Sequence, residues 1–229
     1  MSEIFNESTR VLIVQIYSWY VFVPVVLGAL FWRRLNNAQK FILYIAILSA
    51  VNHKISQVVR TYLATDSNNA WVAHAYVPFI FWFTWRLYKN ELKVLFSSTF
   101  FNITLIICLC FFGVNSLFIQ NLKILPTNGI FLISGVFIFW GVSYFYSLLK
   151  QTVYKSLEKE PVFWFTTGVI MYYSSTFLIF LLVYNYLDKD SETTYIASIF
   201  NAFFNLVLVT TYIISIWVKP PRLVLNNFS

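Results

Sequence analysis

Long apolar runs alternate with short polar connections along most of the chain. A helix needs about 20 apolar residues to cross the hydrocarbon core of a bilayer. Seven runs come close to this length, and we find no sign of a separate soluble module. We predict one transmembrane domain over 1–229, with helices over 11–32, 41–64, 70–88, 94–114, 128–149, 162–186 and 195–218. The expected fold is therefore an all-α membrane protein, a bundle of seven transmembrane helices.

The prolines agree with these segments. Pro24 and Pro78 fall inside predicted spans, where neighbouring helices can satisfy the carbonyls that a proline leaves free. Pro161, Pro220 and Pro221 fall at span ends, where proline commonly starts or stops a helix.

Basic residues concentrate in alternate connections, and this predicts the orientation. Of the 16 Lys and Arg residues, 11 fall on one side of the predicted membrane: Arg33, Arg34, Lys40, Arg86, Lys89, Lys93, Lys150, Lys155, Lys159, Lys219 and Arg222. An excess of Lys and Arg marks the cytoplasmic side of a membrane protein. We therefore expect the N-terminus outside, the C-terminus in the cytoplasm, and a multi-pass protein of the cell inner (plasma) membrane.

The composition supports a lipid-facing surface. The 229 residues are 59% hydrophobic and only 11% charged, whereas soluble domains carry about 25% charged residues. The formal net charge of +7 lies in short clusters between apolar runs, so it indicates orientation, and we expect no nucleic-acid partner.

Polar residues gather in the second predicted span. Ser49, Asn52, His53, Ser56, Gln57 and Arg60 recur at three- and four-residue steps, and Lys54 lies beside them. That spacing forms one polar stripe along a helix. Because polar groups are costly in lipid, the stripe predicts a face turned to the bundle interior or to a cavity. A polar seam between helices remains an alternative, since Ser, Asn, Gln and His often bond across membrane helices.

Other polar residues reach a similar depth in the third, sixth and seventh spans. They are expected to converge with the stripe on a pocket that opens outwards. The predicted ligand-binding residues are Asn52, His53, Lys54, Gln57, Arg60, His74, Tyr76, Tyr172 and Asn201.

The charge balance of that pocket predicts an anionic ligand. Lys54, Arg60 and the two histidines are basic or can become so, and no Asp or Glu falls within the seven predicted spans. A buried cation without a counter-charge is costly, so a carboxylate or a lipid phosphate would complement the pocket. The alternative is that Lys54 and Arg60 extend to the headgroups instead.

Catalytic signatures are lacking in the sequence. Membrane hydrolases that use zinc need several His, Asp or Glu ligands, whereas this chain has two histidines. A retinal protein needs a lysine well inside its last span for the Schiff base, and Lys219 falls at the end of that span. We therefore expect no enzymatic activity, no catalytic residues, no metal and no cofactor.

Two stretches carry a resemblance to a protein family. One comprises Asn68-Asn69-Ala70-Trp71, His74, Tyr76, Pro78 and Leu87-Tyr88, and the other Glu160-Pro161-Val162-Phe163-Trp164, Gly168, Tyr172-Tyr173-Ser174-Ser175 and Phe177. Together with the helix layout, they resemble a group of uncharacterised bacterial seven-helix inner-membrane proteins often encoded near sensor histidine kinases. In that group an acidic residue follows the proline of the third span, whereas here Phe79, Ile80 and Phe81 follow it. The resemblance implies sensing or the regulation of a membrane protein partner such as a histidine kinase.

These observations lead to one expected function and two alternatives. We expect a non-enzymatic sensor or receptor-like subunit that signals through a separate partner, because the connections and the tail after residue 219 are short. The alternatives are a small-solute transporter or channel, and a structural subunit of a membrane complex. The apolar inner half of the second span, 41–48, argues against a continuous polar path.

Overall fold

Helices account for all the regular structure in the parts of the chain that the structure describes. The computed structural model describes residues 7–63, 68–150, 156–185 and 191–219. Its α-helices are α1 Glu7–Tyr20, α2 Val23–Phe31, α3 Asn37–Val58, α4 Ala70–Glu91, α5 Ser98–Val114, α6 Thr127–Leu149, α7 Pro161–Asn185 and α8 Ser191–Trp217. Short 3₁₀ turns η1 Trp32–Arg34 and η4 Leu157–Lys159 and π-helical turns η2 Val59–Leu63 and η3 Asn115–Ile119 complete the set. The predicted all-α class is confirmed for these residues.

Six helical segments within the described ranges are long and apolar enough to cross a membrane, which is typical of a multi-pass membrane protein. They are Gln15–Arg34, Asn37–Tyr62, Ser98–Ile119, Thr127–Leu149, Pro161–Ile179 and Ala197–Trp217. The predicted third span, 70–88, is not among them. It falls on α4, which has 22 residues, but its Trp, Tyr, His, Pro and basic residues lower its mean hydropathy. Seven spans were predicted, and six segments are apolar enough to count as spans, because the composition of α4 is too polar.

The first predicted span is two helices rather than one. Pro24 stands at the start of α2 and has no amide hydrogen to donate to the Tyr20 carbonyl, and a turn at Val21 and Phe22 interrupts the regular helix. The Phe22 amide instead donates to the Trp19 carbonyl at 3.2 Å. The Tyr20 hydroxyl shares a hydrogen bond of 3.1 Å with Thr210 of α8, which ties the break to the bundle.

Capping residues move the starts of two helices away from the predicted positions. The predicted 41–64 segment begins earlier because Asn36 and Gln39 form a capping box, with the Gln39 amide donating to Asn36 Oδ1 at 2.8 Å. The predicted 94–114 segment begins later because Ser97 caps α5, where Ser97 Oγ accepts from the Phe100 amide at 3.2 Å.

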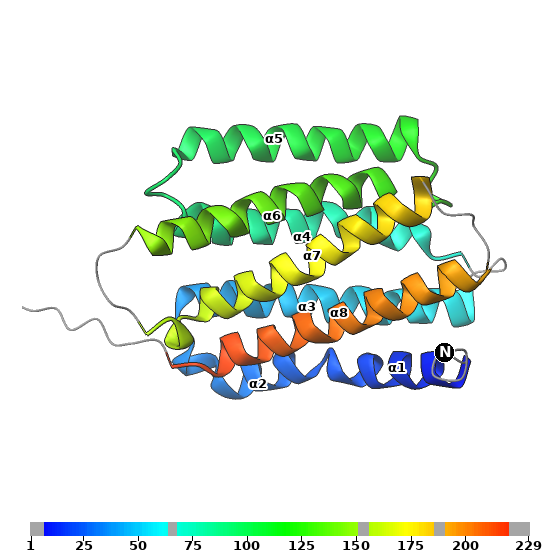
Figure 1. The fold of residues 1–229 in the computed structure, drawn as a ribbon, viewed down its shortest axis with the longest axis horizontal. Coiled ribbons are helices and arrows are strands. Elements are labelled where there is room, and N and C mark those ends of the chain that lie inside the picture. The colour runs from blue at the N-terminus through cyan, green and yellow to red at the C-terminus, as the bar shows by residue number, and fades with distance from the viewer. Residues whose placement is uncertain (1–6, 64–67, 151–155, 186–190, 220–229) are drawn as a thin grey trace, which may run out of the picture.

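The helices lie side by side along the long axis of the molecule and alternate in direction (Figure 1). The α2–α3, α4–α5 and α6–α7 connections and the end of α8 lie at one end, which we call the basic end (left in Figure 1). The start of α1 and the α5–α6 connection lie at the other, the N-terminal end. Helix α7 packs between α6 and α8, α3 packs on α4, and α8 also contacts α1, α2 and α3.

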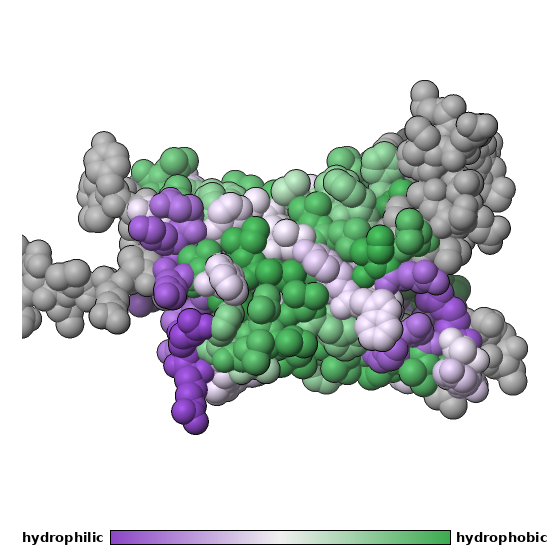
Figure 2. Space-filling model, turned by 90° about the horizontal axis from the view of Figure 1, so that it is seen from below, coloured by the Kyte–Doolittle hydropathy of each residue, from purple (hydrophilic) through white to green (hydrophobic). Residues whose placement is uncertain are grey.

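A surface band between the two ends is apolar. Figure 2 shows hydrophobic residues along the middle of the visible face and hydrophilic residues at both ends. Large apolar side chains on this band are exposed, among them Val26 and Leu30 of α2 and Phe203 of α8. An apolar band with polar ends is the surface expected of a bundle that lies in a bilayer.

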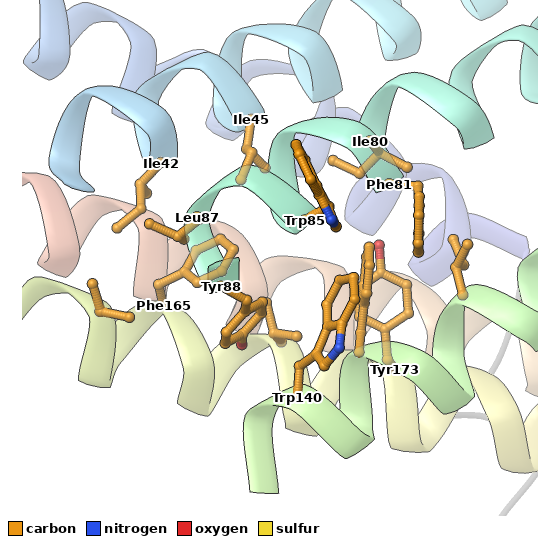
Figure 3. Packing of buried hydrophobic residues seen from close by; sticks show 14 of the residues in the cluster. Ile42, Ile45, Ile80, Phe81, Trp85, Leu87, Tyr88, Trp140, Phe165 and Tyr173 are labelled. Atoms are coloured by element: carbon orange, nitrogen blue, oxygen red, sulfur yellow. The ribbon is translucent and has the colours of Figure 1, made fainter. Parts of the chain in front are cut away.

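Aromatic side chains pack between α4, α6 and α7 (Figure 3). Phe81 of α4 stacks on Phe137 of α6 with ring centroids 5.9 Å apart, and Trp140 lies 5.5 Å from Phe81. Tyr88 and Phe165 lie beside them and are fully buried, with 0% of each side chain exposed. We call these five residues the aromatic core. Large buried rings therefore fill this part of the bundle.

Candidate functional site

A cavity of about 340 Å³ lies between α1, α3, α4, α6, α7 and α8. Its described lining comprises the polar Ser49, Asn52, His53, Ser56, Thr176, Asn201 and Asn205, the tyrosines Tyr17, Tyr76, Tyr172, Tyr173 and Tyr212, and the apolar Ala73, Val77, Leu125, Ile130, Ile133, Leu208 and Val209. Ligand pockets span about 300–1,000 Å³ and combine apolar walls with a few polar groups. The cavity has the size and lining of a small-molecule site.

The cavity lies toward the N-terminal end, next to the aromatic core. Along α4, the lining residues Ala73 and Tyr76 precede Phe81 and Tyr88. Along α7, which runs in the opposite direction, Phe165 precedes Tyr172 (Figure 1). The aromatic core therefore closes the cavity on the side of the basic end.

Helix α3 provides the polar stripe of the cavity wall. Ser49, Asn52, His53 and Ser56 share a face because they are three or four residues apart. Asn52 Oδ1 and His53 Nε2 are buried and have no hydrogen-bond partner. A buried polar atom without a partner is costly by about 1–3 kcal/mol, so these two atoms are ready to bind water or a ligand.

Tyrosines position the stripe from both sides. The Tyr17 ring of α1 meets the His53 imidazole edge to face, with centroids 4.9 Å apart. The Tyr76 hydroxyl of α4 shares a hydrogen bond of 3.1 Å with Ser49 Oγ. Ser49 and His53 are thus held in place while Asn52, between them in sequence, keeps a free carbonyl oxygen.

The opposite wall comes from α7 and α8. Tyr172 and Tyr173 project from α7 with their rings 4.9 Å apart at a near-right angle. On α8, Asn205 Nδ2 donates to the backbone carbonyl of Asn201 at 3.2 Å. Asn201 was predicted as a ligand-binding residue, and the structure puts both asparagines on the cavity wall.

Five of the nine predicted ligand-binding residues line this one cavity. They are Asn52, His53, Tyr76, Tyr172 and Asn201. They were predicted to converge because they lie at a similar depth in their spans, and the bundle brings them together. Whether they bind a ligand stays a prediction.

Lys54, Gln57 and Arg60 do not line the cavity and are exposed. Lys54 Nζ donates to Gln57 Oε1 at 3.1 Å, so the two side chains pair along the outside of α3. Arg60 lies on the π-helical turn η2 beyond the end of α3. The helical period explains this for Lys54, which follows Asn52 and His53 by two and one residues and so points away from the cavity wall, whereas Gln57 lies at the edge of the stripe and turns toward Lys54.

His74 is buried but serves the α5–α6 connection instead of the cavity. One ring nitrogen, Nδ1, lies 2.8 Å from Ser116 Oγ, and the other, Nε2, lies 2.8 Å from the carbonyl oxygen of Ile124. Leu125, next to Ile124, lines the cavity. His74 therefore holds a segment that covers the cavity and has both ring nitrogens occupied.

The described cavity lining carries no Lys, Arg, Asp or Glu. The prediction of an anionic ligand rested on His53, Lys54, Arg60 and His74, and of these four His53 alone lines the cavity. Apart from His53, the polar groups of the described lining are hydroxyls and amides, which are uncharged hydrogen-bonding groups. The arrangement suits an uncharged ligand better than an anion.

Several lining residues were outside the predicted site. Tyr17 and Tyr212 stand in apolar segments with many other aromatic residues, so no spacing distinguishes them. Ser49 and Ser56 belong to the predicted stripe and could have been included on its period alone.

Comparisons with protein-family models, with curated proteins and with solved structures find no match for this chain. Among the described residues, no group of three or more His, Cys, Asp or Glu side chains is placed to hold a metal ion. The cavity geometry is therefore the main basis for a functional proposal.

Proposed function

We propose that this protein is a non-enzymatic, receptor-like membrane subunit that binds a small uncharged molecule in the cavity. The observation that carries the proposal is the pair of buried, unpartnered atoms, Asn52 Oδ1 and His53 Nε2, in a neutral cavity of about 340 Å³. The Asn52 carbonyl oxygen only accepts hydrogen bonds, so the ligand donates at least one. The tyrosine rings and aliphatic residues of the lining would contact its apolar part.

We further propose that α4 also crosses the membrane, which would give seven spans. Support comes from its length of 22 residues and from its place beside α3, α5 and α6 in the bundle. The proposed orientation puts the N-terminal end outside and the basic end in the cytoplasm, because Arg33, Lys93 and Lys150 belong to the connections that lie at the basic end. The membrane would be the cell inner (plasma) membrane.

A signal would leave the cavity through α3 and α8. Both helices line the cavity, and both reach the basic end. There Gln39 of α3 is buried, and its Nε2 donates to the carbonyl oxygens of Ser215, Ile216 and Val218 at 2.9, 3.3 and 2.8 Å. This cap joins the start of α3 to the end of α8, so a ligand that shifts one helix would shift the other.

The recipient of the signal would be a separate membrane protein. A ligand can signal only if it binds two states of the bundle with different affinity. The sequence resemblance favours a sensor histidine kinase as this partner, with contact through the basic connections or the lipid-facing sides of the helices.

A transporter is the second candidate, because the cavity lies inside the bundle and contains unpartnered polar atoms. A transporter would need the aromatic core to open toward the basic end in another conformation. The fully buried Phe81 and Trp140, which pack against each other across α4 and α6, argue against that path. The receptor proposal therefore comes first.

The test compares the wild type with Asn52→Leu, purified from the same membranes and weighed intact by native mass spectrometry. We expect a discrete added mass from a small neutral molecule on the wild type and its loss in Asn52→Leu. Gln57→Leu is the matched control, because it removes an exposed amide of the same helix outside the cavity. Equal retention by both variants, or no added mass on the wild type, would contradict the proposal.

A further inference from the structure

A second hollow lies at the basic end, between η1 and the end of α8. It has a volume of about 460 Å³ and is lined by Phe31, Arg34, Glu158, Lys159, Trp217, Val218 and Lys219. A shallower hollow, lined by Ala29, Leu30, Phe31, Trp32, Arg33 and Arg34, adjoins it through Phe31 and Arg34. The two form one depression that runs from the apolar side of α2 onto the basic end.

The charge of this depression is positive. Arg33, Arg34, Lys159 and Lys219 contribute four basic side chains, and Glu158 contributes one acidic side chain. All five are exposed, so their charged groups are accessible from the water phase. An anion is the complementary ligand.

Arg34 is held in position by aromatic residues. Its guanidinium lies 3.9 Å from the centroid of the Phe31 ring, and the Phe31 ring meets Trp217 edge to face at 5.5 Å. Lys40 lies over Trp32 in the same way, with 5.2 Å between Nζ and the ring centroid. A planar guanidinium fixed on a ring still presents its donors to a phosphate, which matches its geometry.

The side of α2 that borders the depression is apolar and exposed. Val26 and Leu30 of α2 expose 56% and 71% of their surface, and Trp217 exposes 64%. Trp commonly lies at the headgroup level of a membrane. Figure 2 shows the hydrophobic band of this face giving way to hydrophilic residues at the basic end. A molecule bound here would have apolar chains along α2 and an anionic group at Arg34.

We propose that the depression binds an anionic phospholipid, with its phosphate at Arg34 and Lys219 and its acyl chains along Val26 and Leu30. Basic hollows between membrane helices at the cytoplasmic face are suited to anionic headgroups. The lipid would contact Trp217 and Val218, where Gln39 caps α8. This site is separate from the cavity at the N-terminal end, so it stands whether or not that cavity binds a ligand.

The experiment measures which lipids stay bound. Protein in nanodiscs of equal parts phosphatidylglycerol and phosphatidylcholine is released and weighed by native mass spectrometry. A basic side chain near an anionic headgroup contributes about fivefold in affinity. We expect the wild type to retain phosphatidylglycerol preferentially and Arg34→Gln/Lys219→Gln to lose roughly 25-fold in that preference.

The matched control is Arg86→Gln/Lys93→Gln, which removes two exposed basic residues of the α4–α5 region, also at the basic end. This control should keep the preference of the wild type, and Glu158→Gln should increase it. Thermal unfolding of each variant checks that it is folded. An equal loss in both double variants would overturn the proposal in favour of general charge attraction. Displacement of the lipid by millimolar inorganic phosphate would also overturn it, because it would indicate a site for the free anion.

Discussion

Close contacts between small residues set the spacing of α7 and α8. A Cβ atom added at Gly168 of α7 would overlap the Thr211 side chain of α8. Close approach of this kind depends on small residues and is common where membrane helices cross. The crossing matters for the site, because α7 and α8 provide Tyr172 and Asn201 to the cavity wall.

Gly168→Ala should therefore lower the free energy of unfolding. The matched control is Gly135→Ala in α6, where nothing lies within 4 Å of an added Cβ. Both changes gain the same helix propensity, so the difference isolates the overlap, and overpacking costs about 1–3 kcal/mol. Unfolding in detergent monitored by circular dichroism would measure it. Equal stability of the two variants would show that the helices can move apart freely.

Gln39 is the second residue with a large expected effect. Gln39→Leu leaves the carbonyl oxygens of Ser215, Ile216 and Val218 without their donor, and an unmade buried hydrogen bond costs about 1–3 kcal/mol. The variant should unfold at lower temperature and exchange amide hydrogens faster at the end of α8. Asn37→Ala, an exposed change in the same turn, should do neither.

The periodicity of α3 could predict part of the site at residue level. Asn52 and His53 were predicted from the stripe and line the cavity, whereas Lys54 and Gln57, one position further round the helix, do not. His74 could not be assigned from sequence, because its partners Ser116 and Ile124 are more than 40 residues away. Spacing along one helix gives a face but does not say which neighbour covers it.

At the scale of the helix, the lengths of the apolar runs predicted most of the helices. Capping residues and prolines determined where those helices begin and end. The segments over 128–149 and 162–186 match α6 Thr127–Leu149 and α7 Pro161–Asn185 closely. The first segment splits at Pro24, which has no amide hydrogen to donate. Hydropathy could not predict this split, because it does not depend on backbone hydrogen bonds.

Helix α4 gives the sharpest prediction at this scale. If α4 crosses the membrane, Lys93 lies on the cytoplasmic side and Asn121 lies outside; if it does not, the two positions exchange sides. Each is exposed and can be changed to cysteine after Cys108→Ala and Cys110→Ala remove the native thiols. We expect a membrane-impermeant maleimide added to intact cells to label Asn121→Cys and to leave Lys93→Cys unlabelled. The reverse pattern would contradict the proposal of a crossing α4 with the N-terminus outside.

For the whole molecule, the bundle divides along its length into a polar cavity and an aromatic core. The sequence could predict that polar groups converge, because Asn52, Tyr76, Tyr172 and Asn201 come from spans of similar depth. It could not predict the aromatic core, because its five members come from α4, α6 and α7, in a chain with 25 Phe. Which rings meet depends on how the helices are arranged around one another.

Central to this account is the proposal that the cavity opens to the outside and is closed to the cytoplasm. Ala73→Cys tests it, because Ala73 lines the cavity and cysteine is similar in size. Ala46→Cys, on α3 and 1% exposed, is the control for a closed position. Both use the background without native thiols, and a small membrane-impermeant thiosulfonate is applied to right-side-out and to inside-out vesicles.

We predict that the reagent modifies Ala73→Cys from the outside only and leaves Ala46→Cys unmodified from either side. Modification of Ala73→Cys from the cytoplasmic side at a similar rate would contradict the account and favour a transport path. No modification from either side would also contradict it, because the polar groups would then form a closed seam between helices.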